Sequence, residues 1–196
     1  TAASQATELT PTLALELRWP LLKSTRHAVT HVIEPVAQLS WSGGSNPDIP
    51  LDEATLIEFD EGNLFNPSRF NAPDRRERGY TAAYGVSYTR FDPAGWQGSL
   101  ALGQVWRDER LLESDGLTPS FAKSSGLRAR ASDLLIAGQF RNATGLTVTA
   151  RGLFDAMFDT TKAEARASWR NDDTNIAATY VWLSADPAEN RPAKVS

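Results

Sequence analysis

Apolar side chains alternate with small or polar ones, with a period of two, in eight stretches of this chain. Such alternation over several residues is typical of a β-strand with one apolar and one polar face. It predicts strands at about 12–19, 28–41, 79–91, 96–107, 132–141, 146–155, 162–170 and 175–184. We therefore expect an all-β protein made of antiparallel, up-and-down hairpins.

The connections between these strands alternate in length. Those at 20–27, 92–95, 142–145 and 171–174 are short, the hairpin loop at 156–161 is modest, and those at 42–78 and 108–131 are long. Outer-membrane barrels place short turns on the periplasmic side and longer loops outside. The loop lengths therefore predict that 42–78 and 108–131 are extracellular.

Tryptophan placement favours a membrane barrel over a soluble one. In transmembrane β-barrels these amphipathic rings settle at the two water–lipid interfaces. Ten strand residues with a rise of about 3.3 Å, tilted by about 45°, span roughly 23 Å, close to the apolar band of an outer membrane. We expect six interface aromatics at or near strand ends, namely Trp19, Trp41, Trp96, Trp106, Trp169 and Trp182.

The charged side chains decide which strand face is wet. In the strand at 162–170, the charged residues share one face, and three alanines with Trp169 share the other. A Lys or Arg on the lipid face near the midplane costs roughly 2–4 kcal/mol, so the charged face must be aqueous. The candidates for the lumen are Glu16, Arg18, Glu34, Gln38, Arg151, Lys162, Glu164, Arg166 and Arg170. They could line the route of a saccharide chain or form a salt-bridged, hydrated interior, and both interpretations stay open.

The composition argues against several other classes of protein. The chain has 196 residues, a net charge of −4 and no cysteine. The chain contains no run of about 18 apolar residues, so no transmembrane helix is predicted. The net negative charge argues against a nucleic-acid partner. Disulfides and thiolate metal sites are absent. The N-terminus lacks the basic start and apolar core of a signal peptide, so we expect a mature chain or, preferably, a fragment.

No pattern predicts catalysis, a bound metal or a cofactor. His27 and His31 would lie about 13 Å apart along a strand, and neither Gly-x-Ser-x-Gly nor a phosphate-binding glycine loop occurs. The acidic start of the 42–78 loop could bind divalent cations, but a solvated surface is the preferred interpretation. Asp74 and the neighbouring arginines are expected to form a clasp that folds the loop over the lumen. Pro35 lacks a backbone donor, and we expect a β-bulge there rather than a weak seam.

The loop at 42–78 carries the least generic motifs of the sequence, namely Ile49-Pro50 and the residues Asn63, Leu64, Phe65, Arg69, Phe70, Asp74 and Arg75. Further motifs outside the loop are His31-Val32-Ile33-Glu34-Pro35-Val36, Tyr84-Gly85, Ala150-Arg151-Gly152-Leu153-Phe154-Asp155 and Asp186-Pro187. In their order and spacing, these motifs resemble those of the LptD, or organic-solvent-tolerance, family.

This resemblance implies part of a very large barrel in the outer membrane of a Gram-negative bacterium. Such a barrel encloses a plug lipoprotein of the LptE type and inserts lipopolysaccharide into the outer leaflet. The leading hypothesis is that 1–196 is part of one such barrel domain and supplies about eight strands. The alternatives are a passive porin-like or structural barrel, and a soluble β-barrel binding a small apolar ligand. Alternation alone does not decide which face points inward.

Overall fold

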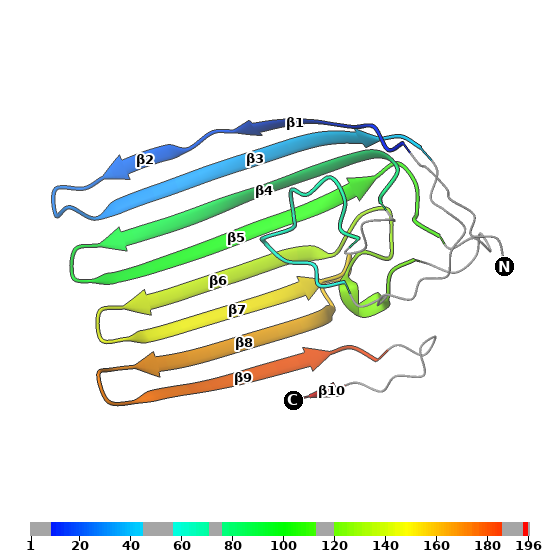
Figure 1. Ribbon diagram of the computed structural model, residues 1–196. Coiled ribbons are helices and arrows are strands. Elements are labelled where there is room, and N and C mark those ends of the chain that lie inside the picture. Colours follow the sequence, from blue (N-terminus) through cyan, green and yellow to red (C-terminus); the bar gives the residue numbers. More distant parts are fainter. Residues whose placement is uncertain (1–8, 45–56, 71–75, 113–119, 186–193, 196) are drawn as a thin grey trace.

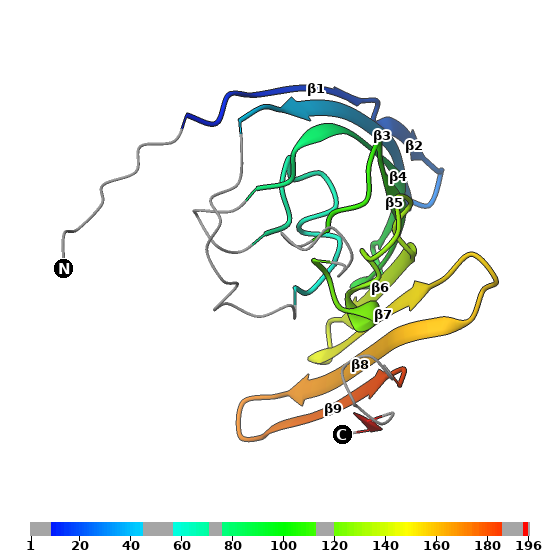
Figure 2. The same cartoon turned by 90° about the vertical axis from the view of Figure 1, so that its right-hand side faces the viewer.

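The described strands form one curved antiparallel sheet, and the described parts of the long connections lie on its concave side (Figures 1 and 2). The computed structural model describes residues 9–44, 57–70, 76–112 and 120–185, and the backbone of 194–195. The strands are β1 (Thr12–Arg18), β2 (Leu21–Ser24), β3 (Thr30–Ser42), β4 (Gly79–Asp92), β5 (Trp96–Arg107), β6 (Leu134–Asn142), β7 (Leu146–Phe154), β8 (Thr160–Arg170), β9 (Asn175–Leu183) and β10 (Lys194–Val195), with one 3₁₀ turn, η1 (Lys123–Ser125).

The strands pair in chain order. Both β1 and β2 pair with β3, and each strand from β3 onward pairs with the next one along the chain. Short turns collect at one end of the sheet and the long connections at the other (Figure 1). All eight predicted strands are present, and the all-β, up-and-down expectation is confirmed. Among the described strands, β1 does not pair with β9 or β10, so the sheet is open and not a closed barrel. Within the same residues, no helix is long and apolar enough to cross a membrane.

The predicted connection at 20–27 is wrong. The strand breaks after Arg18, resumes as β2 and turns only at 25–29, where Thr25 N donates to Val29 O at 2.9 Å. Pro20 explains the break, because it offers no N–H to the ladder. Trp19 therefore lies inside an interrupted edge strand rather than beside a turn, and its N donates to Pro35 O at 3.1 Å.

The β-bulge expected at Pro35 is also wrong. Pro35 pairs in register with Val86, and the β3 register is the same on both sides of the β1–β2 break. The N and C=O of a strand residue point toward the same neighbour, so the donor that Pro35 lacks faces Trp19 at that break. The ladder is already interrupted there, and the sheet accommodates the proline without a shift. A register shift occurs instead between Leu153 and Phe154, in the β7–β8 pair.

The register segregates the two faces of the sheet as the alternation predicts. Directly paired residues point to the same face. Leu13 pairs with Trp41 and Trp41 with Tyr80 on the convex face, where Leu13 is 70% exposed. Arg151 pairs with Glu164 on the concave face. Most of the exposed large apolar side chains thus point away from the connections, and the charged side chains of β1, β7 and β8 point toward them.

A small core forms where the long connections fold back onto the concave face. It is made of buried side chains from both connections and from β4 to β7, namely Ile57, Phe59, Leu64, Ala83, Val105, Phe121, Leu127, Leu135 and Leu153. In Figure 2 the 57–70 segment lies inside the curve of the sheet. The core therefore fixes this segment, which we call the inner loop, above the polar face.

Candidate functional site

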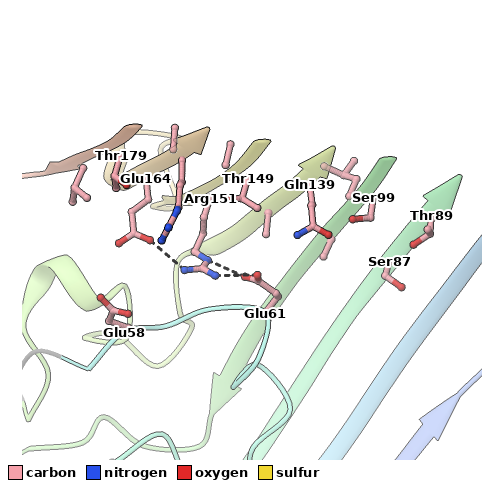
Figure 3. A pocket seen from close by; sticks show the side chains of 18 residues that line it. Glu58, Glu61, Ser87, Thr89, Ser99, Gln139, Thr149, Arg151, Glu164 and Thr179 are labelled. Carbon is pink, nitrogen blue, oxygen red and sulfur yellow. Dashed lines mark hydrogen bonds and ion pairs between the residues drawn. The ribbon is translucent and has the colours of Figure 1, made fainter. Parts of the chain in front are cut away.

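A polar cavity of about 570 Å³ lies on the concave face beside the inner loop. Its floor comes from residues of β4 to β9, and its rim from Glu58 and Glu61 of the inner loop (Figure 3). Hydroxyl and amide side chains line one part, and charged side chains the other. The labelled lining residues are Glu58, Glu61, Ser87, Thr89, Ser99, Gln139, Thr149, Arg151, Glu164 and Thr179. These polar side chains can exchange hydrogen bonds with water or with a polar ligand.

Arg151 on β7 joins the inner loop to the sheet. Its Nε and Nη2 donate to the two carboxylate oxygens of Glu61 at 2.8 and 2.9 Å, and its Nη1 donates to Glu164 at 3.2 Å (Figure 3). Burial has the largest effect on the pKa of Glu61 and raises it, but the hydrogen bonds and the charge of Arg151, together with a backbone hydrogen bond, lower the pKa by more in sum, so the net shift is downward. Lys162 extends the network, with Nζ 2.6 Å from Glu164 and 3.6 Å from Glu58. This guanidinium–carboxylate fork is the strongest polar link at the rim.

Leu64 anchors the inner loop by packing into a depression in the sheet, where two paired glycines have no side chains. Gly85 and Gly103 are paired across β4 and β5, and Leu64 lies over them with only 3% of its surface exposed. A Cβ on Gly103 would come within 2.2 Å of Leu64 Cδ2, so only glycine leaves room for this contact. The two glycines therefore form a receptor for one leucine of the family-like Asn63-Leu64-Phe65 motif.

The turn before Leu64 is held by reciprocal hydrogen bonds. Asp60 Oδ1 accepts from Gly62 N at 2.9 Å and from Asn63 N at 3.0 Å. Asn63 Oδ1 accepts from Asp60 N at 3.0 Å, and its Nδ2 donates to Glu58 O. This Asx-type geometry explains why the motif begins with asparagine.

A buried ionic cluster closes the inner loop at its C-terminal end. Glu77 is 1% exposed, and its carboxylate accepts from Arg69 Nη1 at 3.0 Å and from Arg107 Nε at 2.6 Å. It also accepts from Arg69 N at 3.0 Å and from Arg107 Nη2 at 3.3 Å. Burial has the largest effect on the pKa of Glu77 and raises it, but the charges and hydrogen bonds of Arg107 and Arg69 together outweigh burial and lower the pKa below its usual range. Burial lowers the pKa of Arg69. The cluster thus ties the loop to the end of β5.

The predicted lumen residues all lie on the concave side of the sheet, in two groups. In the first, Arg18 binds Glu16 at 2.5 Å and Glu34 at 3.1 Å, while Gln38 Nε2 donates to Glu16 at 3.1 Å. The second contains Arg151, Lys162, Glu164, Arg166 and Arg170 on β7 and β8. Arg166 lines the cavity, and the described residues give it no ion pair. The structure therefore links the predicted residues locally, not in one continuous network.

The tryptophans of the strand ends share the convex face. Trp96 and Trp106 lie ten residues apart on β5, and Trp169 lies at the same turn end as Trp96, where its Nε1 donates to Thr144 O at 2.9 Å. Trp41 and Trp182 belong to the loop end. Their assignment to membrane interfaces stays a prediction.

The clasp expected around Asp74 and Arg75 falls outside the described residues, as do Ile49-Pro50, Asp186-Pro187 and the first acidic residues of the loop. In the acidic first part of that loop, the described acids Glu58, Asp60 and Glu61 each have hydrogen-bond or ion-pair partners. Within the described chain, no group of three or more His, Cys, Asp or Glu could hold a metal ion.

The sequence interpretation missed Glu77 and Arg107. One signal was available, because Glu77 is the single acid in a run that is otherwise Arg75-Arg76 and Arg78. A carboxylate surrounded by arginines is a candidate for a buried pair. Nothing local marked Arg107 as its partner, because 30 residues separate them. The depression formed by Gly85 and Gly103 could not be predicted either, because the two glycines meet only after β4 and β5 pair.

An open, up-and-down sheet with an exposed apolar convex face and a charged concave face has the architecture of a wall segment of an outer-membrane β-barrel. The family model described as "LptD: LPS transport system D" matches residues 1–195. The chain therefore belongs to the LptD family, whose members act in lipopolysaccharide transport at the outer membrane and are not an enzyme family. A comparison with curated proteins finds no match. Outer-membrane location removes the soluble β-barrel alternative.

Proposed function

We propose that this chain forms part of the wall of the translocon that inserts lipopolysaccharide into the outer leaflet. The concave face carries the saccharide portion through water, while the acyl chains stay at the lipid-facing wall. The observation that carries this proposal is the separation of the two faces, with Arg151, Glu164 and Arg166 on one side of β7–β8 and alanines on the other. The role is mechanical and electrostatic, and it needs no covalent step.

The orientation follows from the connections. With short turns in the periplasm and long loops outside, 42–78 and 108–131 are extracellular, and 1–196 belongs to a single barrel domain. The inner loop then covers the concave face from outside. Its fixation by Leu64, Arg151 and Glu77 supports a narrowed extracellular end of the passage.

The lumen-facing residues supply a hydrated surface for sugars. Serine and threonine hydroxyls from β4, β5, β7 and β9 line the cavity together with Gln139, and such groups exchange hydrogen bonds with saccharides and water alike. Arg166 adds a cation for the phosphate groups that lipopolysaccharide carries.

A plug lipoprotein of the LptE type is the proposed partner, by family resemblance. Two apolar side chains at the periplasmic end of the concave face support a protein occupant there. Leu22 is 70% and Phe91 44% exposed, and the register of both strands places them on the polar side. Exposed apolar groups in an otherwise wet channel suit contact with another protein.

Photo-crosslinking from adjacent residues tests the proposal. A photoreactive amino acid at Thr149 points into the concave cavity, whereas the same group at Val148 points to the convex face. In cells, Thr149 is expected to capture lipopolysaccharide, detected as an antibody-reactive adduct, and Val148 to capture much less of it. If Thr149 yields no adduct while the protein is folded and lipopolysaccharide reaches the surface, the passive-barrel alternative is favoured.

A further inference from the structure

A row of basic side chains crosses three neighbouring strands on the convex face, close to the short turns. Lys23 on β2 pairs with His31 on β3, and His31 pairs with Arg90 on β4. Residues paired directly across antiparallel strands have Cβ atoms about 5 Å apart and point to the same face. The turn between β2 and β3 adds Arg26 and His27 at the same corner. We call Lys23, His31 and Arg90 the basic row.

This corner is unbalanced in charge within an acidic protein. The sequence contains no acidic residue between Glu16 and Glu34, and both histidines of the chain lie in that interval. Asp92 is the nearby carboxylate, and Arg90 Nη2 donates to it at 2.9 Å. Lys23 is exposed and forms no ion pair with any described residue. Lys23 and Arg90 lie on either side of His31 on the same face, so an external anion at the row would lie close to two cationic side chains.

Aromatic side chains surround the basic row in the manner of a membrane interface. The guanidinium carbon of Arg90 lies 4.6 Å from the centre of the Trp96 ring, and that ring lies 5.9 Å from the ring of Phe140. His31 Nδ1 shares a hydrogen bond of 2.8 Å with Tyr88 Oη. Arg90 thus leans toward Asp92 and Trp96, both nearer the strand end. Long basic side chains on a lipid-facing surface extend in this way toward headgroups and water.

We propose that the basic row binds the phosphate headgroup of an anionic phospholipid in the periplasmic leaflet of the outer membrane. The inference rests on the proposed orientation, in which the short turns are periplasmic and the convex face meets lipid. A phosphate beside Lys23 and His31 would neutralise the positive charge of the basic row that Asp92 does not neutralise. The acyl chains of the same lipid would then cover the apolar side chains that line this face, such as Ile33 and Leu100, both more than 40% exposed.

Native mass spectrometry of the full-length protein, released from nanodiscs, tests this site. The discs contain phosphatidylcholine mixed with phosphatidylglycerol, and the readout is the number of phosphatidylglycerol molecules that each protein retains. The test variant is Lys23→Gln with Arg90→Gln. The matched control is Arg141→Gln with Arg170→Gln, which removes the same charge near the same turns but from the concave face. Altered mobility on unheated gels reports whether each variant is folded.

Each cation near an anionic headgroup contributes roughly a fivefold preference. We therefore expect the test variant to retain phosphatidylglycerol at least about fivefold less well than the wild type, and the control to match the wild type. Equal losses in test and control, or no loss in a folded test variant, would overturn the site. The lipid site would also be overturned if the basic row bound inorganic phosphate alone and its occupancy did not depend on the lipid. Because lipopolysaccharide crosslinking at Thr149 does not depend on this readout, the two proposals can fail separately.

Discussion

Replacing Glu77 with Gln is expected to release the inner loop from the sheet. The wild-type carboxylate accepts four hydrogen bonds, and the side chains of Arg69 and Arg107 beside it are 0% and 2% exposed. Glutamine keeps the size but removes the charge, which leaves two guanidinium groups buried together without a counter-ion. Breaking a buried ion pair in this way costs about 3–5 kcal/mol. Every 1.4 kcal/mol is a factor of ten, so the undocked population should rise more than about a hundredfold.

Limited chymotrypsin digestion of the full-length protein in detergent measures this population. The inner loop offers Phe59, Leu64 and Phe65 as cleavage sites, and the first two are buried in the wild type. Cleavage after them, located by mass spectrometry, should accelerate strongly in Glu77→Gln. Glu61→Gln is the control, because its ion pair is half exposed and such pairs contribute only about 0–1 kcal/mol.

A second variant tests whether the uncompensated positive charge, rather than the altered side-chain shape, releases the inner loop. Glu77→Gln combined with Arg69→Gln removes one of the two uncompensated cations and should recover part of the protection. If Glu77→Gln is folded and its inner loop is cut no faster than in the wild type, the cluster does not hold the loop, and our account of it is wrong.

Three further predictions concern the same loop. The pKa of Glu77 is lowered in the folded protein. The stabilisation by its carboxylate is therefore present above the unfolded pKa of about 4.3 and is lost as the pH falls through the folded-state pKa. Protection of the inner loop from protease should persist at about pH 5 and above and decline in stronger acid. Gly103→Val should undock Leu64, and Leu64→Ala should cost about 2–5 kcal/mol by leaving a cavity; in a double-mutant cycle read by chymotrypsin protection, the combined loss should be smaller than the two single losses added. Arg151→Gln should increase cleavage after Phe65 by a few-fold, and an unchanged rate would show that the Glu61 link is weak.

The strands could be predicted because their alternation is regular. The predicted strand at 96–107 has the bounds of β5, and the one at 79–91 ends one residue before β4 does. The errors lie where a proline interrupts the pattern. The sequence predicted a connection at 20–27, but pairing with β3 keeps β2 in register, because the pairing partner, and not the local sequence, sets a strand's extent at an edge.

The faces were predictable and the loop anchoring was not. Charge position alone placed Lys162, Glu164 and Arg166 on one side of β8, since a period of two leaves no other choice. The contact of Leu64 with Gly103 joins segments that are far apart along the chain, and no local pattern records it. Glycine in a strand could signal close approach by other groups, but the sequence does not say by which residue.

The Arg69–Glu77–Arg107 cluster also makes the loop a check on strand alignment during assembly. Strands that pair only with their chain neighbours can be added hairpin by hairpin, with little long-range search. A slip of one residue between β4 and β5 would turn Arg107 to the opposite face and leave Glu77 with half its partners. Misaligned hairpins would then leave the inner loop undocked, and only the correct alignment would bury Glu77 between both arginines.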